Sequence, residues 1–288
     1  MRWRELLREA SRRLADAGIE QAPFEARLLA ADAAGLKVEN LVLARDQEVP
    51  AAQQEAVQRA IARRSGREPA SQILGWREFW GLRFLVDNTV LTPRPDSETL
   101  IEATLGRIAD RNRPLRLLDL GTGSGCLALA LLSELPNAQA VAVDRSPQAL
   151  TIAARNAHAL GLADRIVFRC GSWTAGLAGS FEIAVCNPPY IPTAEITRLE
   201  PEVRNYEPRL ALDGGADGLA AYRTILGDLP TMLEPAAVLA LEVGAGQAAG
   251  LAQLVEKAGF SNLARHRDLA GIERVVSALL APAPPHRP

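Results

Sequence analysis

The pattern of hydrophobic positions divides the 288-residue chain into two parts of different character. Within residues 2–17, apolar residues recur three or four positions apart, as on one face of a helix, and Gly18 follows as a stop signal. Similar helical patterns occupy residues 22–35 and 50–66, each closed by a glycine. We therefore predict a small helical domain over residues 1–74, and nothing in it has a catalytic pattern.

The next segment, residues 75–90, is richer in aromatic and β-branched residues. Its sequence GWREFWGLRFLVD centres on Gly81 and predicts a β-hairpin that links two domains. The sequence LTPRPDSETL follows, and its two prolines rigidify the approach to a helix. Either Asp96 or Ser97 is expected to cap that helix.

From about residue 114, strands and helices alternate. The pattern predicts strands at 116–120, 138–144, 165–170, 181–186, 237–243, 261–268 and 273–280, with helices between them that include 145–161, 219–233 and 246–258. Such alternation is typical of a mostly parallel, doubly wound α/β sheet, which binds ligands at the carboxyl ends of its strands. A polar, glycine-rich stretch over 191–218 receives no element, and the tail 281–288 is predicted to be loose.

Composition is that of an ordinary globular protein, with 48% hydrophobic and 23% charged residues. No apolar run approaches the ~20 residues that span a bilayer. The first residues, MRWRELLREASRRL, form an amphipathic pattern without the apolar core of a signal peptide. We therefore expect a cytoplasmic protein without membrane contact.

The cysteines and histidines are scattered, and none has metal-ligand spacing. We expect Cys126, Cys170 and Cys186 to be small buried hydrophobic residues and predict no metal. The formal net charge is −2, with 14 Lys and Arg against 12 Asp and Glu over residues 1–85, and 18 against 22 over residues 86–288. Neither part could hold a nucleic-acid duplex by charge alone. Nothing indicates an oligomer interface, so we expect a monomer.

A glycine loop follows the first predicted strand of the sheet. Its residues are Gly121, Thr122, Gly123, Ser124 and Gly125. The glycines allow a tight turn and let a ligand lie against bare backbone. Asp144 ends the next strand, where a carboxylate can accept hydrogen bonds from both hydroxyls of a ribose. The spacing G-x-G-x-G favours S-adenosylmethionine over NAD, and a purely structural turn remains an alternative.

A tryptophan follows the third predicted strand at the same edge. Trp173 could pack against an adenine ring, although an ordinary core position explains it equally well.

The sequence NPPY leaves the fourth predicted strand beside the same crevice. Asn187 and Pro188 both precede a proline, so both favour extended backbone that displays their carbonyl groups. The side-chain oxygen of Asn187 adds an acceptor, and Pro188 and Pro189 have no N–H that would compete. With Tyr190 as an aromatic plate, this edge suits a planar NH₂ group, although an untidy strand exit remains the alternative.

An amide nitrogen is a poor nucleophile because its lone pair is delocalised. Methyl transfer to it needs the nitrogen about 3–3.5 Å from the donor methyl. Carbonyl acceptors stabilise the positive charge that develops on the nitrogen. The nitrogen becomes acidic as it is alkylated, so no strong base is required. This agrees with the NPPY sequence itself, which contains no His or Cys.

These motifs together resemble the release-factor glutamine methyltransferases (the HemK/PrmC family). The resemblance rests on GWREFWGLRFLVDNTVLTPRPDSETL, LDLGTGSG, AVAVDRS, CNPPYIP and EPRLALDGGADGL in this order. It implies a helical substrate-docking domain joined by a β-hairpin to a seven-stranded, Rossmann-like methyltransferase domain over 91–280. It also implies transfer of a methyl group from S-adenosyl-L-methionine to the glutamine of the Gly-Gly-Gln motif in class-1 peptide chain release factors.

The resemblance also implies residue roles. The glycine loop and Asp144 would hold the cofactor with Trp173 beside its adenine, and Asn187 to Tyr190 would hold the glutamine amide, with Asn187, Pro188 and Tyr190 as the catalytic group and Asn187 near both ligands. Ser172 departs from the acidic residue that methyltransferases often carry there for the adenine amino group. No contact follows for Arg94 from the sequence.

Three alternatives stay open. An N6-adenine DNA methyltransferase would use a similar motif, but it must flip a base and grip the duplex, for which the chain has no basic groove. A glutamine methyltransferase acting on a ribosomal protein is closer, and the N-terminal region favours the release-factor group. A cofactor-binding adaptor without chemistry would not need an amide clamp.

Overall fold

A computed structural model describes residues 1–281, so the predicted tail at 281–288 lies, except for its first residue, outside the described residues. The chain divides into two compact units. The first consists of Met1–Trp76 and Glu200–Tyr206, and the second of Arg77–Leu199 and the chain from Glu207 onward.

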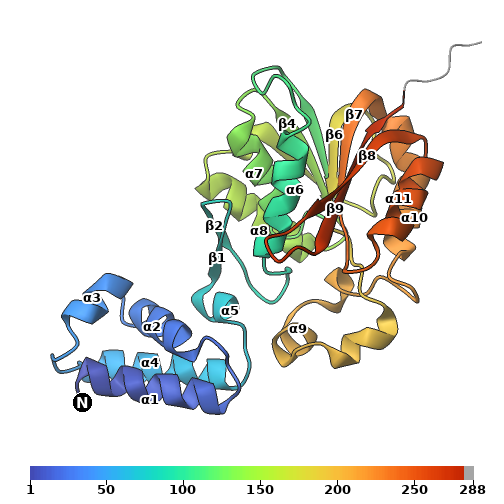
Figure 1. Ribbon diagram of the computed structural model, residues 1–288. Helices are drawn as coiled ribbons and strands as arrows, with labels where there is room; N and C mark the ends of the chain where they lie inside the picture. The colour runs from blue at the N-terminus through green and yellow to red at the C-terminus, as the bar shows by residue number, and fades with distance from the viewer. Residues whose placement is uncertain (282–288) are drawn as a thin grey trace, which may run out of the picture. The chain divides into compact units, whose positions relative to one another are not determined.

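The first unit is helical. Its N-terminal elements are α1 (Trp3–Asp16), α2 (Ala22–Ala33), α3 (Val38–Leu43), α4 (Ala51–Ser65) and α5 (Ala70–Leu74) (Figure 1). Trp3, Leu6, Ala10 and Leu14 are the buried side chains of α1, at the helical spacing that the sequence predicts. They share one core with residues of α2 and α4, which include Leu29 and Val57.

A short helix from a distant part of the sequence completes this unit. Helix α9 (Pro201–Tyr206) lies inside the polar stretch to which the sequence pattern assigned no element. Glu202 accepts hydrogen bonds from Arg64 (Nη1–Oε1, 3.0 Å) and from Arg67 (Nη2–Oε2, 2.7 Å). Tyr206 donates from its hydroxyl to the carbonyl of Gly66 (2.8 Å). Long-range ion pairs hold α9 in place, and for this reason local periodicity does not reveal it.

The predicted hairpin is present. Strands β1 (Trp76–Phe79) and β2 (Leu82–Leu85) form a two-stranded sheet. Trp80 and Gly81 both have positive φ (54° and 67°), as a two-residue hairpin turn requires. The indole of Trp80 donates to Glu134 (2.9 Å) and its backbone N–H to Glu98 (2.8 Å), so the turn is attached to the second unit.

The second unit is built on a seven-stranded sheet in the order β5-β4-β3-β6-β7-β9-β8. The first five of these strands run parallel, and β9 is antiparallel to both β7 and β8. The strands are β3 (Arg116–Leu120), β4 (Gln139–Asp144), β5 (Ile166–Cys170), β6 (Phe181–Cys186), β7 (Leu233–Glu242), β8 (Phe260–Arg267) and β9 (Glu273–Leu280). The predicted α/β fold is confirmed.

Helices cover both faces of the sheet. On one face lie α6 (Glu98–Leu105), α7 (Cys126–Glu134) and α8 (Pro147–Ala159), and on the other α10 (Ala220–Asp228) and α11 (Ala248–Lys257) (Figure 1). Short 3₁₀ helices join these elements, at Pro95–Ser97, Ala163–Arg165, Thr193–Arg198, Arg209–Ala211 and Leu229–Met232. Alternate residues of β3 face opposite sides of the sheet. Leu117 packs in the core that includes residues of α6 and α7, and Leu118 and Leu120 pack in the core that includes residues of α10 and α11.

Three predictions need correction. The predicted helix 219–233 ends at Asp228, because a 3₁₀ turn follows and β7 begins at Leu233 instead of residue 237. Cys186 is buried as expected, whereas Cys126 is half-buried and Cys170 is exposed, because the Cys170 side chain lies on β5 at the edge of the sheet. Ser97 stands at the N-terminal cap position of α6, but its side chain makes no capping hydrogen bond.

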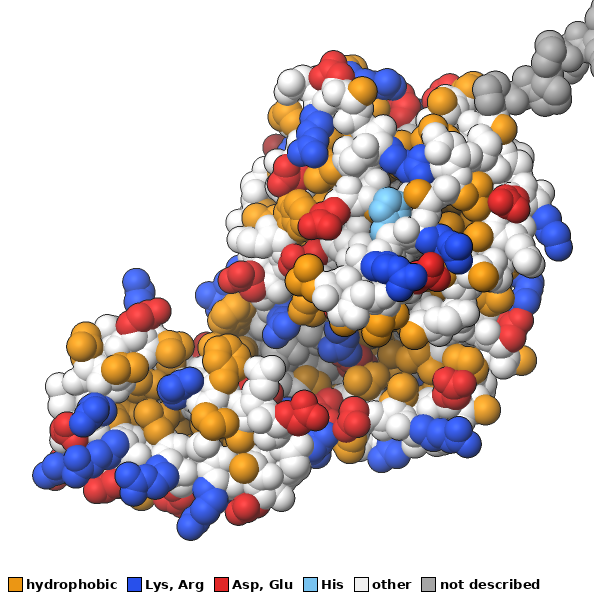
Figure 2. All heavy atoms as spheres, viewed as in Figure 1, with side chains coloured by type: hydrophobic (Ala, Val, Ile, Leu, Met, Phe, Trp, Pro, Cys, Tyr) orange, Lys and Arg blue, Asp and Glu red, His pale blue; other side chains and the backbone are white. Residues whose placement is uncertain are grey.

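Within residues 1–281 no helix is long and apolar enough to cross a membrane. The same residues contain no group of three or more His, Cys, Asp or Glu side chains that could hold a metal ion. On the face that Figure 2 displays, Lys and Arg side chains are interspersed with Asp and Glu.

Candidate active site

The glycine loop joins β3 to α7 and is shaped by backbone geometry. Gly121, Gly123 and Gly125 all have positive φ (74°, 55° and 82°). A Cβ atom at Gly125 would lie 3.1 Å from Leu129 of α7 and 3.3 Å from Ala153 of α8, so a side chain there would crowd both helices. The loop therefore requires glycine for conformation at all three positions and for packing at one of them.

Asp144, at the end of β4, braces this loop. Its Oδ2 accepts from the backbone N–H of Gly123 (2.9 Å), and its Oδ1 from that of Ser146 (2.9 Å). Each carboxylate oxygen has two lone pairs, so both can still accept a ligand hydroxyl. Ser146 also caps α8 as predicted, since its hydroxyl accepts from the N–H of Ala149 (3.2 Å).

A second acid below the loop was not singled out from the sequence. Asp119 is fully buried, and its Oδ2 accepts from the hydroxyl of Thr122 (2.6 Å). Burial raises its pKa to about 7. The signal was available, because a charged residue inside a buried parallel strand is unusual and directly precedes the loop.

Trp173 lies against the glycine loop. A Cβ atom at Gly121 would stand 3.4 Å from Cζ3 of the Trp173 ring, so the missing side chain makes room for the indole. Trp173 has positive φ (51°), which is uncommon for a bulky residue and indicates a conformation imposed by its surroundings. Ser172 beside it is exposed and lines the same pocket.

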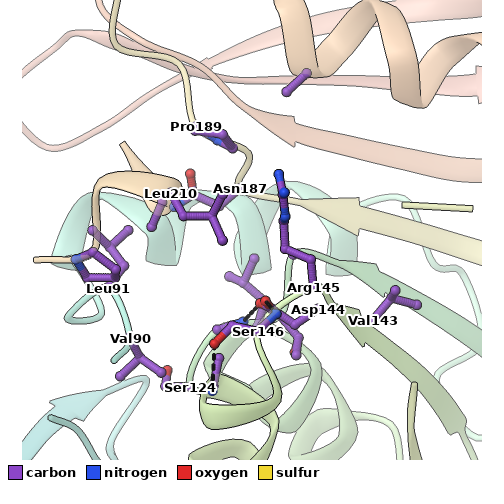
Figure 3. Close-up of a pocket in the computed structure, with 18 of the residues that line it drawn as sticks. Val90, Leu91, Ser124, Val143, Asp144, Arg145, Ser146, Asn187, Pro189 and Leu210 are labelled. Atoms are coloured by element: carbon purple, nitrogen blue, oxygen red, sulfur yellow. Dashed lines mark hydrogen bonds between the residues drawn. The ribbon is translucent and has the colours of Figure 1, made fainter. Parts of the chain in front are cut away.

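One cavity brings the two motifs together. It has a volume of about 340 Å³, a size that suits a small-molecule cofactor. Figure 3 shows Asn187 and Pro189 on one side of this pocket and Asp144 and Ser146 on the other. Of the predicted site residues, the lining includes Gly121, Thr122, Gly123, Ser124, Asp144, Trp173, Asn187 and Pro189.

Three predicted site residues are not part of this lining. Gly125 directly precedes helix α7, and Pro188 is buried. Tyr190 directs its hydroxyl to Oε1 of Glu242 (3.3 Å), and burial raises the pKa of the phenol. The structure therefore does not present the Tyr190 ring as a plate in the cavity, because a buried phenol needs a hydrogen-bond partner and finds it at the end of β7.

Glycines of the segment DGGADGL and the side chain of Gln247 surround the backbone of the NPPY sequence. A Cβ atom at Gly218 would lie 2.2 Å from the carbonyl oxygen of Tyr190, and one at Gly214 would lie 2.8 Å from that of Pro189. The side chain of Gln247 donates to the carbonyl of Tyr190 (2.9 Å). These contacts fix the backbone of the motif, and they explain the value of the glycines in the sequence DGGADGL.

The prolines before α6 carry residues of the pocket wall. Arg94 lines the cavity and donates to both carboxylate oxygens of Glu207 (2.7 Å each). Glu207 is buried, and burial raises its pKa. Arg94, to which the sequence assigned no contact, therefore neutralises a buried carboxyl and links this segment to the chain after α9.

Ser97 does not cap α6 as predicted, since its side chain accepts no hydrogen bond from the helix. Its hydroxyl instead accepts from Nδ2 of Asn187 (3.3 Å). The local sequence predicted a helix cap, but the Ser97 hydroxyl pairs with Asn187, which is distant in the sequence.

The fold and this pocket define a class. The sheet has seven strands, of which β9 is antiparallel, and a glycine loop and an acidic residue lie at the carboxyl ends of its strands. This arrangement is that of an S-adenosyl-L-methionine-dependent methyltransferase. The residues fit that cofactor, because the glycines leave bare backbone and Asp144 faces the same cavity.

Comparisons with known proteins agree. Residues 5–75 match the family model of the PrmC N-terminal domain, and residues 98–199 match that of the methyltransferase small domain. The release factor glutamine methyltransferase of Rhodospirillum rubrum is 46% identical over 283 residues, which cover 98% of this chain and 86% of that protein. The protein of the same name from Cereibacter sphaeroides is 44% identical over 284 residues, covering 98% of this chain and all of that protein.

The solved structures add support for the fold. The hMettl16 catalytic domain, determined in complex with MAT2A 3′UTR hairpin 6, superposes with a TM-score of 0.59 at 19% identity, covering 75% of this chain and 82% of that one. The chain belongs to the release factor glutamine methyltransferase family, as the sequence resemblance implied.

Proposed function

We propose that this enzyme transfers a methyl group from S-adenosyl-L-methionine to the side-chain amide nitrogen of the glutamine in the Gly-Gly-Gln motif of class-1 release factors. One observation carries the proposal. Asn187 and Pro189 of the NPPY sequence line the same cavity as the glycine loop and Asp144. A planar NH₂ group held by the first set lies within reach of a methyl donor held by the second.

In this proposal the NPPY sequence binds and orients the amide. Its two N–H protons need two acceptors, which the Asn187 side-chain oxygen and the backbone carbonyls of the motif supply. Pro188 and Pro189 have no backbone N–H that would turn toward the same oxygens. The acceptors also stabilise the positive charge that develops on the nitrogen, so the site works without a strong base.

The other half of the pocket would hold the cofactor, which supplies an electrophilic methyl group when bound. Gly121, Gly123 and their neighbours would lie against it, and Asp144 would accept from the ribose hydroxyls. Trp173 would pack beside the adenine, with Ser172 as a weak polar partner.

The helical part, residues 1–74, is proposed to dock the protein substrate, with residues 75–90 as the linker and 91–280 as the catalytic domain. A release factor is far larger than the cavity, so binding requires surface outside it. The substrate belongs to translation, which places the enzyme in the cytoplasm, and the monomer remains our expectation.

The test uses purified enzyme, S-adenosyl-L-methionine and a release factor that lacks the modification, with mass spectrometry of the Gly-Gly-Gln peptide. We expect one methyl group on the glutamine side chain. Duplex DNA and ribosomal protein serve as competing substrates in parallel reactions. A methyl group on adenine or on a ribosomal glutamine, with none on the release factor, would refute the proposal.

A further inference from the structure

The side chain of Asn156 lies in the interior, between the glycine loop and the end of β2. It is fully buried on α8 and is not among the residues that line the cavity. Its Nδ2 donates to the carbonyls of Ser124 (2.8 Å) and Leu85 (3.1 Å), and its Oδ1 accepts from the backbone N–H of Leu85 (2.7 Å). One side chain therefore holds two segments that are far apart in the sequence.

These three hydrogen bonds fix the orientation of the Asn156 amide. Both Nδ2 protons have a carbonyl partner and Oδ1 has an N–H partner, so an inverted amide would lose all three bonds. At Leu85 the side chain bonds both backbone groups, as a neighbouring strand would, although β2 has only β1 as a strand partner. The contact attaches the end of β2 to α8 at a defined place.

Both segments that Asn156 holds continue into walls of the cavity. Ser124 of the glycine loop lines it, and so do residues 89–91, which follow shortly after Leu85 (Figure 3). Apolar contacts fix this second wall to the same helix, in a cluster made by Val86, Val90, Ala149 and Ile152. Helix α8 is therefore the common support of two walls, and Asn156 is the residue of the helix that bonds to both.

Packing alone does not account for an asparagine at this position. Asparagine is a poorer helix former than alanine, and its amide loses its hydrogen bonds to water on burial. The other buried residues of α8 are apolar, namely Ala149, Ile152, Ala153 and Ala157. An apolar side chain at 156 would fill space in the same way but would remove the hydrogen bonds to Ser124 and Leu85.

We propose that Asn156 is a positioning residue for the cofactor. It holds the Ser124 carbonyl and the start of the second wall on α8, and so sets the separation of the two walls before the cofactor binds. Walls that are already ordered lose little conformational freedom on binding, which raises affinity. The inference rests on the cofactor half of the proposed function and does not depend on which methyl acceptor the enzyme uses.

Calorimetric titration of the full-length enzyme with S-adenosyl-L-methionine tests the inference. Asn156→Ala removes all three hydrogen bonds. We expect the Kd to rise about tenfold, because the two walls must then be ordered on binding. The kcat at saturating cofactor and release factor should stay within about threefold, because no group proposed to contact the amide has changed.

A matched control is Thr104→Val. Thr104 is also fully buried, and its hydroxyl donates to the carbonyl of Leu100 within α6 (2.8 Å), away from the pocket lining. This variant should lose stability and keep the Kd within about twofold of the wild type. An equal rise of the Kd in Thr104→Val and Asn156→Ala would overturn the inference.

A second variant covers the case in which Asn156→Ala does not fold. Asn156→Asp keeps the shape and the acceptor for the Leu85 N–H, but its ionised carboxyl cannot donate to the two carbonyls. The Kd should rise at least as much as in Asn156→Ala. A Kd within about twofold of the wild type in either folded variant would refute the positioning role.

Hydrogen exchange separates this inference from the proposed function, because it needs no methyl acceptor. In the cofactor-free wild type the N–H of Leu85 should already be protected, and S-adenosyl-L-methionine should add little protection. The same N–H should exchange faster in Asn156→Ala than in Thr104→Val. An unprotected Leu85 N–H in the free wild type sinks the inference even if the enzyme methylates release factors. If Kd and exchange respond as expected and the Gly-Gly-Gln glutamine stays unmodified, the positioning role stands and the proposed substrate is wrong.

Discussion

The two sides of the pocket are built in different ways. The side that we propose for the cofactor uses the ends of three neighbouring strands, β3, β4 and β5, and consists largely of backbone, with glycines at positive φ and Asp144 bound to two N–H groups. The side that we propose for the substrate gathers side chains from the 3₁₀ turn before α6, the loop after β6 and the end of β7. The first side is formed by strand ends and the loops that directly follow them, whereas the second brings together segments that are far apart in the sequence.

Because the two sides are built from different segments, cofactor binding and turnover should respond to different substitutions. Substitutions on the cofactor side should change affinity for S-adenosyl-L-methionine, and substitutions on the substrate side should change turnover.

Replacing Asn187 should have the largest effect. Asn187→Ala removes an acceptor that serves the developing charge, and loss of one such group lowers kcat by about 10²–10³. Affinity for S-adenosyl-L-methionine, measured by calorimetry, should change by no more than a few-fold. Normal turnover in this variant would show that the amide is held elsewhere.

Glu242 should make the stability of the substrate side depend on pH. Burial raises its pKa from 4.5 to about 7, so the folded state holds a proton over a range in which the unfolded state has released it. The free energy of unfolding from this group therefore falls as pH rises through that range, by about 3 kcal/mol in total. Glu242→Gln lacks this dependence.

Urea unfolding of both proteins at about pH 5 and about pH 8 measures it. Asp119, whose pKa is also raised, is present in both and cancels in the difference. The stability of Glu242→Gln relative to the wild type should be greater at the higher pH. A difference that is independent of pH would mean that Glu242 titrates normally.

Replacing Asp144 should affect the cofactor side instead. Asp144→Asn removes the charge and leaves one acceptor oxygen where two N–H groups and a ligand need partners. The Kd for S-adenosyl-L-methionine should rise about tenfold or more, since hydrogen bonds to a charged group contribute about 1.5–3 kcal/mol. Turnover at saturating cofactor should stay near that of the wild type, with the exposed Asp164→Asn as the control. A fall in kcat without a change in Kd would contradict the separation of the two sides.

Gly218 offers a smaller but sharper comparison. A methyl group there would collide with the carbonyl of Tyr190, 2.2 Å away, whereas one at Gly271 meets nothing within 4 Å. Both have positive φ (76° and 81°), so both alanine variants share a backbone cost of about 1–2 kcal/mol. Only Gly218→Ala should also lower kcat, by about tenfold through displacement of the NPPY backbone. Equal kcat in the two variants would show that this contact does not position the motif.

The sequence predicted the cofactor side better than the substrate side for a physical reason. The glycine loop and Asp144 lie at strand ends whose parallel order follows from alternating strands and helices, so local pattern is enough to bring them together. The Tyr190 hydroxyl finds its partner in Glu242, more than 50 residues away along the chain, and the Ser97 hydroxyl finds its partner in the equally distant Asn187. A local rule assigned Ser97 to a helix cap, and no local rule indicated Glu242.

The same reason explains α9. Its six residues are too few for helical periodicity to be recognised, and its place in the helical unit depends on Arg64 and Arg67. By contrast, the predicted helix over residues 2–17 was found because its apolar face is continuous through α1.

The central claim is that the substrate side selects a planar NH₂ group by presenting acceptors to it. The most direct test replaces the glutamine of the Gly-Gly-Gln motif by glutamate and measures methyl incorporation into the release factor. A carboxylate is a better nucleophile than an amide but offers no proton to the acceptors, so we expect methylation of the glutamine protein and none of the glutamate protein. Formation of a methyl ester on the glutamate at a comparable rate would contradict the account.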